Sequence, residues 1–222
     1  YTPMWAGYPS TASRGATGDA LAMATKVGAA LGQMDRSGPQ TVAYQTGNGA
    51  VSLTNVRYNG AILVNEDGNR FVNEFALTPI LGKAIKDQKD GHAYLIFDQA
   101  SVDRAALMKK YKEAGYFVEA PTLDALAKKL GINAENLSKT VAAYQKGMDD
   151  GVDHEFGRKD SRFSRIDKAP YYGAKISPAS QTTYGGVQID LKARAVTETG
   201  KVVPGLYVSG EAASQYGQGV SI

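Results

Sequence analysis

The last third of the chain alternates short β-forming runs with paired glycines, and this pattern constrains the fold more than any other feature. Residues 169–178 read APYYGAKISP, residues 183–190 read TYGGVQID and residues 204–212 read PGLYVSGEA. Tyrosine, valine and isoleucine favour strands, whereas strand glycines mark turns or places where another backbone or a ligand comes close. The last run ends at Gly210 and Glu211, so a strand delivers backbone amides and one carboxylate to one point. Such an arrangement can hold a polar cofactor.

The first half of the sequence predicts one helix followed by strands. Residues 15–31 are expected to form a helix with small residues on its packing face, with Thr17 as its cap and Asp19 in its first turn. Strands are expected at residues 61–65, 70–74 and 92–98, and a hairpin-type turn at 66–69 joins the first two.

The middle of the chain is predicted to be helical. One helix starts at Ser101 and reaches about Ala114, a second lies between Thr122 as its cap and Gly131, and a third follows Asn133. Residues 151–165 are charged and aperiodic, so they predict a long surface loop whose acidic residues are solvated.

Composition excludes several classes of function. The 222 residues can hold one large domain or two small ones, and the hydrophobic content of 43% is ordinary for a globular protein. The net charge of +3 comes from scattered lysines, which is not the footprint of a nucleic-acid-binding protein. No apolar run approaches the roughly 20 residues that a membrane helix needs. The absence of cysteine excludes disulfides and thiolate chemistry, but it leaves the cellular compartment open.

Five segments in the same order resemble the fumarate reductase/succinate dehydrogenase flavoprotein family, especially its soluble flavocytochrome c branch. These segments are GATGD at 15–19, NGAILVN at 59–65 with GNRFVNE at 68–74, YLIFD at 94–98, LAKKL at 126–130, and the glycine-punctuated stretch described above. The family is related to the 3-ketosteroid dehydrogenases. Each motif alone is weak, whereas their common order is a specific signal.

The resemblance implies an α+β fold with a split architecture. A capping (clamp) domain of residues 37–180 would be flanked by two partial α/β FAD-binding segments, residues 1–36 and 181–222. The family's N-terminal nucleotide-binding unit, with its GxGxxG loop, has no counterpart here, and that unit supplies the helix N-terminus that binds pyrophosphate. We therefore expect poor FAD binding by this polypeptide alone, with the missing unit either on another chain or lost from a processed or truncated product.

FAD is the cofactor that the resemblance implies. Asp19 and Glu211 are the carboxylates expected to accept hydrogen bonds from its ribityl or ribose hydroxyls. Without the resemblance, Asp19 is equally a plain first-turn carboxylate and Glu211 an exposed strand end. By resemblance, the same site is lined by Thr17, Gly18, Gly210, Ser221 and Ile222.

Several positions depart from the substrate-binding pattern of the fumarate-reducing members. Gln181 and Thr182 stand in place of a histidine pair, and Tyr216 stands in place of an arginine. Gln40 lies near the place of a further histidine, and residues 75–79 lack the proton-donating arginine. Binding a dicarboxylate takes two fixed cations, so we expect that fumarate is not the substrate.

The remaining candidates for catalysis are a cation and two phenols. Arg57 is retained from the family pattern, although its glutamate partner is replaced by Thr54. Tyr184 and Tyr216 can deliver a proton or donate to a carbonyl oxygen, as the resemblance to 3-ketosteroid dehydrogenases implies, or they can simply pack as aromatic residues. The substrate-binding candidates are Gln181, Thr182, Thr183 and Gln40. The two histidines, His92 and His154, are assigned no chemistry and no metal.

The sequence thus predicts an FAD-dependent oxidoreductase that reduces or forms an activated C=C bond by hydride transfer at flavin N5. Its partner would be a small unsaturated substrate, and a steroid-type dehydrogenase is a variant of this hypothesis. The alternative is a non-catalytic capping fragment that needs a partner chain to bind flavin. The sequence does not indicate the electron donor.

Overall fold

The computed structural model describes residues 6–159 and 164–214. The chain divides into two compact units, one comprising Tyr1–Pro39 with Ala179–Ile222 and the other Gln40–Pro178. We call the first the flanking unit and the second the central unit. Their boundaries lie within three residues of those predicted for the FAD-binding segments and the capping domain, although that functional assignment stays a prediction.

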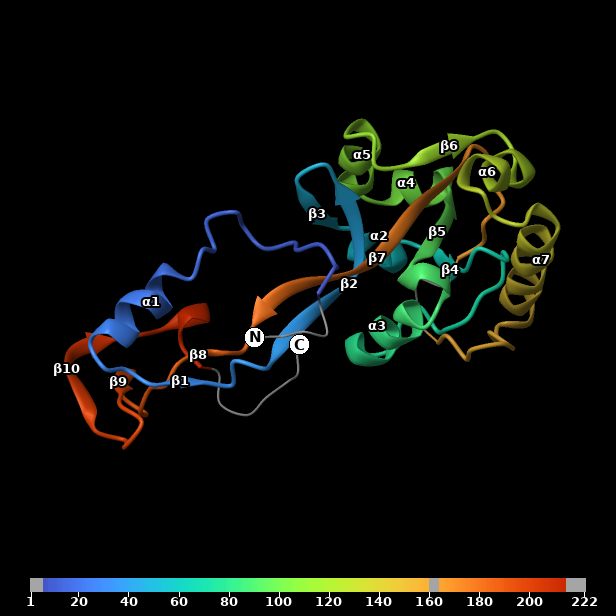
Figure 1. Cartoon of the computed structure of the whole chain (residues 1–222). Helices are drawn as coiled ribbons and strands as arrows, with labels where there is room; N and C mark the ends of the chain where they lie inside the picture. Colours follow the sequence, from blue (N-terminus) through green and yellow to red (C-terminus); the bar gives the residue numbers. More distant parts are fainter. Residues whose placement is uncertain (1–5, 160–163, 215–222) are drawn as a thin grey trace. The chain divides into compact units, whose positions relative to one another are not determined.

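The central unit is built on a largely antiparallel sheet with helices on both faces (Figure 1). Its strands follow the order β3 (Gly49–Ser52), β2 (Ser37–Thr46), β7 (Tyr171–Thr183), β5 (Ala93–Asp98) and β4 (Ile62–Val64), and β6 (Val118–Ala120) also pairs with β7. Every residue of β5 is buried, as expected for a strand that is covered on both faces. β5 therefore lies in the hydrophobic core of the central unit.

The two faces of β5 carry separate hydrophobic clusters. Ala93, Leu95 and Phe97 join one cluster, and Tyr94 and Ile96 join the other. The first cluster receives side chains from α2 (Thr54–Tyr58), α3 (Thr78–Lys86), α4 (Gln99–Arg104) and α5 (Ala106–Glu113). The second receives side chains from α6 (Leu123–Leu130) and α7 (Ala134–Asp150), and a short 3-10 helix, η2 (Lys89–Gly91), precedes β5.

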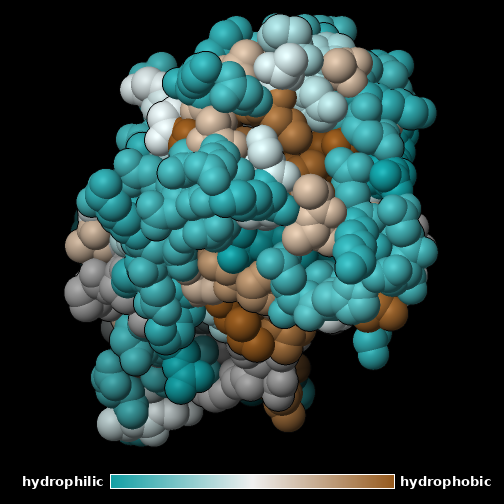
Figure 2. Space-filling view, turned by 90° about the vertical axis from the view of Figure 1, so that its right-hand side faces the viewer, coloured by the Kyte–Doolittle hydropathy of each residue, from teal (hydrophilic) through white to brown (hydrophobic). Residues whose placement is uncertain are grey.

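The predicted cap of α6 is confirmed, and Asn133, which was expected to precede the next helix, caps α7. The Thr122 hydroxyl accepts a hydrogen bond from the Ala125 amide at 3.1 Å, and the Asn133 side chain accepts one from the Asn136 amide at 3.0 Å. Gly131 ends α6 in the left-handed conformation, as predicted. The side of the molecule that carries α7 presents a largely hydrophilic surface interrupted by hydrophobic patches (Figure 2).

Two predicted elements of the central unit are wrong. Residues 70–74 form no return strand, because the Glu74 carboxylate accepts a hydrogen bond from the Leu63 amide at 3.1 Å, and only Arg70 makes a bridge to β4. The predicted helix 101–114 is two helices, since Ala105 adopts extended backbone angles between α4 and α5. Asp98, rather than Ser101, caps the first of them.

The flanking unit is smaller and is organised around short strands. β1 (Leu31–Gly32) pairs with β8 (Gly186–Val187), and β9 (Arg194–Val196) pairs with β10 (Val202–Tyr207), both antiparallel. α1 (Asp19–Lys26) precedes β1, and the 3-10 turn η3 (Gly210–Ala212) follows β10. A small core of Ala24, Ala29, Val187, Ala195 and Val203 joins these elements.

The predicted helix 15–31 is shorter than expected. It runs from Asp19 to Lys26, and its cap residue is Gly18, with a φ of 82°, rather than Thr17. The Thr17 hydroxyl instead donates to Asp19 Oδ2 at 2.8 Å, which explains why it caps no amide. Among the residues that the structure describes, no helix is long and apolar enough to cross a membrane.

Candidate functional site

Glu211 and Thr183 lie together in the flanking unit. Glu211 is exposed on η3, and its Oε1 accepts a hydrogen bond from the Thr183 amide at 3.2 Å. η3 packs tightly against β8, because a Cβ on Gly186 would lie 2.5 Å from the Ala212 carbonyl oxygen. The structure therefore brings one predicted cofactor-side residue and one predicted substrate-side residue into contact, with a glycine allowing the close approach.

The second predicted carboxylate, Asp19, lies in the first turn of α1 and is exposed. The strand β8 contacts both α1 and η3, so one short strand links the elements that carry Asp19 and Glu211. Thr17 and Gly18 directly precede Asp19, as predicted for one lining segment. Gly210 precedes Glu211 in the same manner and adopts a φ of 68°.

The residues of the flanking unit fit the polyol part of a flavin cofactor. Asp19 uses Oδ2 to accept from Thr17, and Glu211 uses Oε1 to accept from the Thr183 amide. Within the described part of the chain, the second oxygen of each carboxylate has no hydrogen-bond donor, so each can accept from a hydroxyl. Bound FAD would present such hydroxyls on its ribityl and ribose groups.

The other predicted residues of the flanking unit lie at the end of β7 and just after it. Gln181 and Thr183 are exposed, whereas Thr182 and Tyr184 are half-buried. The Tyr184 amide donates to the Arg36 carbonyl at 3.1 Å, and its phenol lies against Gly38. The backbone of Tyr184 is therefore fixed by a hydrogen bond, and its ring packs against Gly38. Tyr216, Ser221 and Ile222 lie outside the described residues.

Arg57 is buried in the central unit, which rules out the alternative that it is a surface charge. It lies at the end of α2 and is only 4% exposed. It donates to the Glu74 carbonyl and to the Tyr58 hydroxyl, and its guanidinium lies 4.5 Å from the centre of the Tyr58 ring. Its Nε–H has no hydrogen-bond partner among the described residues. Burial lowers the pKa of Arg57, and the charge of Arg158 acts in the same direction.

Gln40 and Thr54 are the two neutral residues at altered family positions in the central unit, and they contact each other. The Thr54 hydroxyl donates to Gln40 Oε1 at 2.5 Å, and the Val42 amide approaches the same oxygen at 3.4 Å. Gln40 is buried, so this pair is a fixed neutral group. The two substitutions therefore complement each other locally.

A buried ion network in the central unit escaped the sequence analysis. Arg70 pairs with both Glu74 and Asp153 at 2.9 Å, and Arg158 approaches Glu74 at 3.4 Å. Burial raises the pKa of Asp153, but the hydrogen bonds from Arg70 and from the amides of Arg158 and Phe156, together with the charge of Arg70, outweigh it and hold that pKa at about 2. The prediction of a solvated loop at 151–165 is thus wrong for Asp153 and Arg158, which are 5% and 1% exposed.

One sequence signal could have revealed this network. Arg70 and Glu74 are separated by four residues within a family motif, and four-residue spacing allows ion pairing when the chain turns. Their partners lie 83 and 84 residues further along the chain, and no local pattern specifies that distance. The sequence could therefore indicate the pair of Arg70 and Glu74, but not their partners Asp153 and Arg158.

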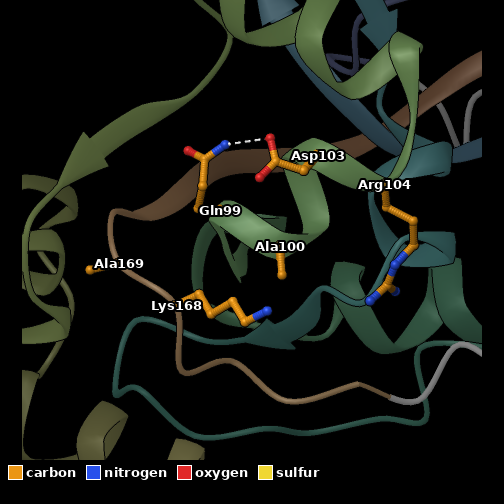
Figure 3. Close-up of a pocket in the computed structure, with 6 residues that line it drawn as sticks. All are labelled: Gln99, Ala100, Asp103, Arg104, Lys168 and Ala169. Atoms are coloured by element: carbon orange, nitrogen blue, oxygen red, sulfur yellow. Dashed lines mark hydrogen bonds between the residues drawn. The ribbon is translucent and has the colours of Figure 1, made fainter.

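The one surface hollow that stands out in the described part of the central unit contains no predicted site residue. It is lined by Gln99, Ala100, Asp103, Arg104, Lys168 and Ala169 (Figure 3). The Gln99 amide donates to Asp103 at 2.9 Å across its rim. Arg104 in this lining donates to the Ser164 hydroxyl at 3.2 Å, and we assign the hollow no chemistry. The described residues contain no group of side chains that could hold a metal ion.

Comparison with known proteins identifies the family. Residues 3–220 match the family described as FAD binding domain. The chain belongs to this family. The predicted resemblance to the fumarate reductase flavoproteins is thereby confirmed, since the relatives below carry that name or related ones.

Two relatives show the range of this family. The chain is 37% identical over 210 residues to a fumarate reductase (cytochrome) of Shewanella frigidimarina, covering 94% of this chain and 36% of the relative. It is 35% identical over 214 residues to a urocanate reductase of Eggerthella lenta, covering 92% of this chain and 35% of the relative. The chain thus spans little more than a third of the length of these relatives.

Two solved structures resemble the fold. The open conformation of a flavocytochrome c3 fumarate reductase matches with a TM-score of 0.81 and 30% identity, over 95% of this chain and 37% of that protein. A 3-ketosteroid Δ1-dehydrogenase from Sterolibacterium denitrificans matches with a TM-score of 0.67 and 25% identity, over 89% of this chain and 41% of that protein. The fold is therefore a part of the fumarate reductase flavoprotein fold.

Proposed function

We propose that this protein is an FAD-dependent oxidoreductase that reduces, or in reverse forms, an activated C=C bond. Membership of the FAD-binding family over nearly the whole chain carries the proposal. Fumarate reductase and urocanate reductase, which are named for the reduction of conjugated C=C bonds, are among its relatives. In this proposal the flanking unit contributes to the flavin site and the central unit is the capping domain.

Bound FAD would supply hydride transfer at its N5 atom. The chain's own contribution on this side is to bind and orient the cofactor. Asp19 and Glu211 would accept hydrogen bonds from its hydroxyls through the oxygens that have no donor within the described residues. Gly18 and Gly210 would let the backbone approach the cofactor closely, because neither carries a side chain in the way.

The proposed substrate carries at most one carboxylate. A dicarboxylate needs two fixed cations, and the positions that correspond to several family cations hold Gln40, Gln181 and Thr182. Gln40 is already held in a neutral pair with Thr54, so it offers an amide rather than a charge. A conjugated monocarboxylate or an uncharged enone fits this set of residues better than fumarate does.

Arg57 is the proposed proton-transfer residue of the central unit. A guanidinium whose pKa is lowered by burial gives up a proton more readily than an exposed one. Within residues 6–159 and 164–214, its Nε–H also has no hydrogen-bond partner, so this donor is available to a substrate or a water. Tyr184 and Tyr216 are the candidates in the flanking unit, because a phenol can deliver a proton or polarise a carbonyl oxygen.

Turnover with a panel of electron acceptors tests this proposal. The protein, purified from its source with its flavin, is mixed with a reduced dye, and dye oxidation is followed with fumarate, an aryl-substituted acrylate and a cyclic enone. We expect the monocarboxylate or the enone to be reduced faster than fumarate, and Arg57→Lys to lower kcat by at least about 100-fold, in the range for a general acid. Fumarate as the best acceptor would contradict the substrate class, and unchanged turnover of Arg57→Lys would remove Arg57 from the reaction.

A further inference from the structure

Arg158 is the most deeply buried arginine among the described residues, and the proposed function does not use it. It is 1% exposed, although it lies in a segment rich in charge and glycine. Its backbone amide donates to Asp153 Oδ2 at 3.1 Å, which fixes the backbone from which the side chain extends. Its guanidinium lies 4.6 Å from the centre of the Phe75 ring, which covers one face. Such a group is held in one orientation.

The guanidinium of Arg158 reaches the segment that carries Arg57. Nη1 donates to the Ala61 carbonyl at 3.1 Å and approaches Glu74 Oε2 at 3.4 Å, while Nη2 donates to the Arg57 carbonyl at 3.4 Å. One planar fork thus bridges the end of α2 and the start of β4. Arg158 and Arg57 lie 101 residues apart in the sequence, so this hydrogen bond is a tertiary contact and not a local one.

Glu74 contacts both Arg57 and Arg158. Its carbonyl oxygen accepts from Arg57 Nη1, and its carboxylate is shared by Arg70 and Arg158. Besides its contact with the Tyr58 hydroxyl, Arg57 is therefore held at its backbone by Arg158 and at its guanidinium by the Glu74 carbonyl. Both holders belong to the same buried ion network, and that network also includes Asp153.

We propose that Arg158 is a positioning residue for Arg57. Its forked contacts fix the backbone from which the Arg57 guanidinium extends, and its charge lies close to that guanidinium in a buried environment. Lysine cannot serve in the same way, because its single ammonium cannot make the parallel contacts of a planar fork. The inference rests on the proposed function only where it treats Arg57 as a proton-transfer residue.

The exchange of the Arg57 Nε proton with solvent tests the positioning directly and needs no turnover. In the whole chain labelled with 15N-arginine, the Arg57 Nε–H signal is assigned by its loss in Arg57→Lys. We expect Arg158→Met to speed its exchange by about ten-fold or more, because the charged group whose hydrogen bond holds the Arg57 backbone is lost and water can then reach the buried Nε–H. The backbone amide of Leu95, in the centre of β5, should change by less than about two-fold. Arg165→Met, which removes an exposed arginine from the same part of the chain, should change neither rate.

The outcomes separate positioning from general stabilisation. Unchanged exchange at Arg57 in Arg158→Met, or an equal acceleration at Arg57 and Leu95, would overturn the proposal. If Arg158→Met does not fold, Arg158→Lys decides: faster exchange at Arg57 alone supports the proposal, and wild-type exchange refutes it. Turnover then tests the proposed function separately, because Arg57→Lys lowers kcat only if Arg57 acts in the reaction, whatever the exchange experiment shows.

Discussion

Replacement of Asp153 by asparagine should destabilise the central unit strongly. Asp153 is 5% exposed, pairs with Arg70 at 2.9 Å through each of its two oxygens, and accepts hydrogen bonds from the amides of Glu155 and Arg158. Breaking a buried ion pair costs about 3–5 kcal/mol. Arg70 keeps Glu74, and the asparagine oxygen can still accept one bond, so we expect the lower end, about 3 kcal/mol.

The pH dependence of this loss gives a second test. The folded pKa of Asp153 is about 2, below its model-compound value of 3.8, so the charged carboxylate stabilises the fold above pH 4 and loses that effect as the pH falls through this window. Linkage predicts that the gap between wild type and Asp153→Asn narrows by about 1 kcal/mol between pH 7 and pH 3, since at pH 3 the unfolded carboxyl is mostly protonated and the folded one is not.

Urea unfolding followed by far-UV circular dichroism measures both effects. Asp149→Asn is the matched control, because Asp149 is an aspartate of the same region whose side chain is 63% exposed and pairs with Arg165 on the surface. We expect it to change the unfolding free energy by less than about 1 kcal/mol. A loss below about 1 kcal/mol for Asp153→Asn at pH 7, or a gap that does not depend on pH, would refute the reasoning about the buried network.

Three further predictions concern stability and cofactor binding. Thr122→Ala removes the cap of α6 and should lower the unfolding free energy by about 1 kcal/mol in urea, whereas an unchanged midpoint would argue against the cap. Gly186→Ala places a Cβ 2.5 Å from the Ala212 carbonyl oxygen, so we expect about 1–3 kcal/mol of destabilisation, seen as faster amide exchange in β8 with β5 unaffected. Glu211→Gln should weaken flavin retention by about ten-fold in equilibrium dialysis, while Glu198→Gln, an exposed glutamate of the same unit, should have no effect.

Much of the fold was predictable because its signals are local. The cap Thr122 and the terminator Gly131 of α6 depend only on residues within one turn, and both were predicted correctly. The buried strand β5 was visible as a short apolar run after a turn. The errors arose where tertiary contacts override local pattern. The Glu74 carboxylate takes the amide that a return strand would have paired with, and the backbone at Ala105 interrupts a helical periodicity.

The candidate site was predictable only in part, for the same reason. The contact between Thr183 and Glu211 joins two segments that the sequence had already marked as parts of one family motif. The burial of Asp153 and Arg158 was not predictable, because a charged, glycine-bearing segment favours solvent unless distant counter-ions are known. Arg70 and Glu74 supply those counter-ions from more than 80 residues away.

The flavin content of the protein purified from its source tests the central proposal most directly. Absorbance near about 450 nm, a property of the oxidised cofactor itself, reports bound flavin, and release by heat identifies it as FAD. We predict about one FAD for each copy of this chain when it is isolated together with a nucleotide-binding unit, with a clear loss in Glu211→Gln. A colourless, stably folded protein that takes up no added FAD in the presence of that unit would contradict the proposal and would favour a non-catalytic capping module.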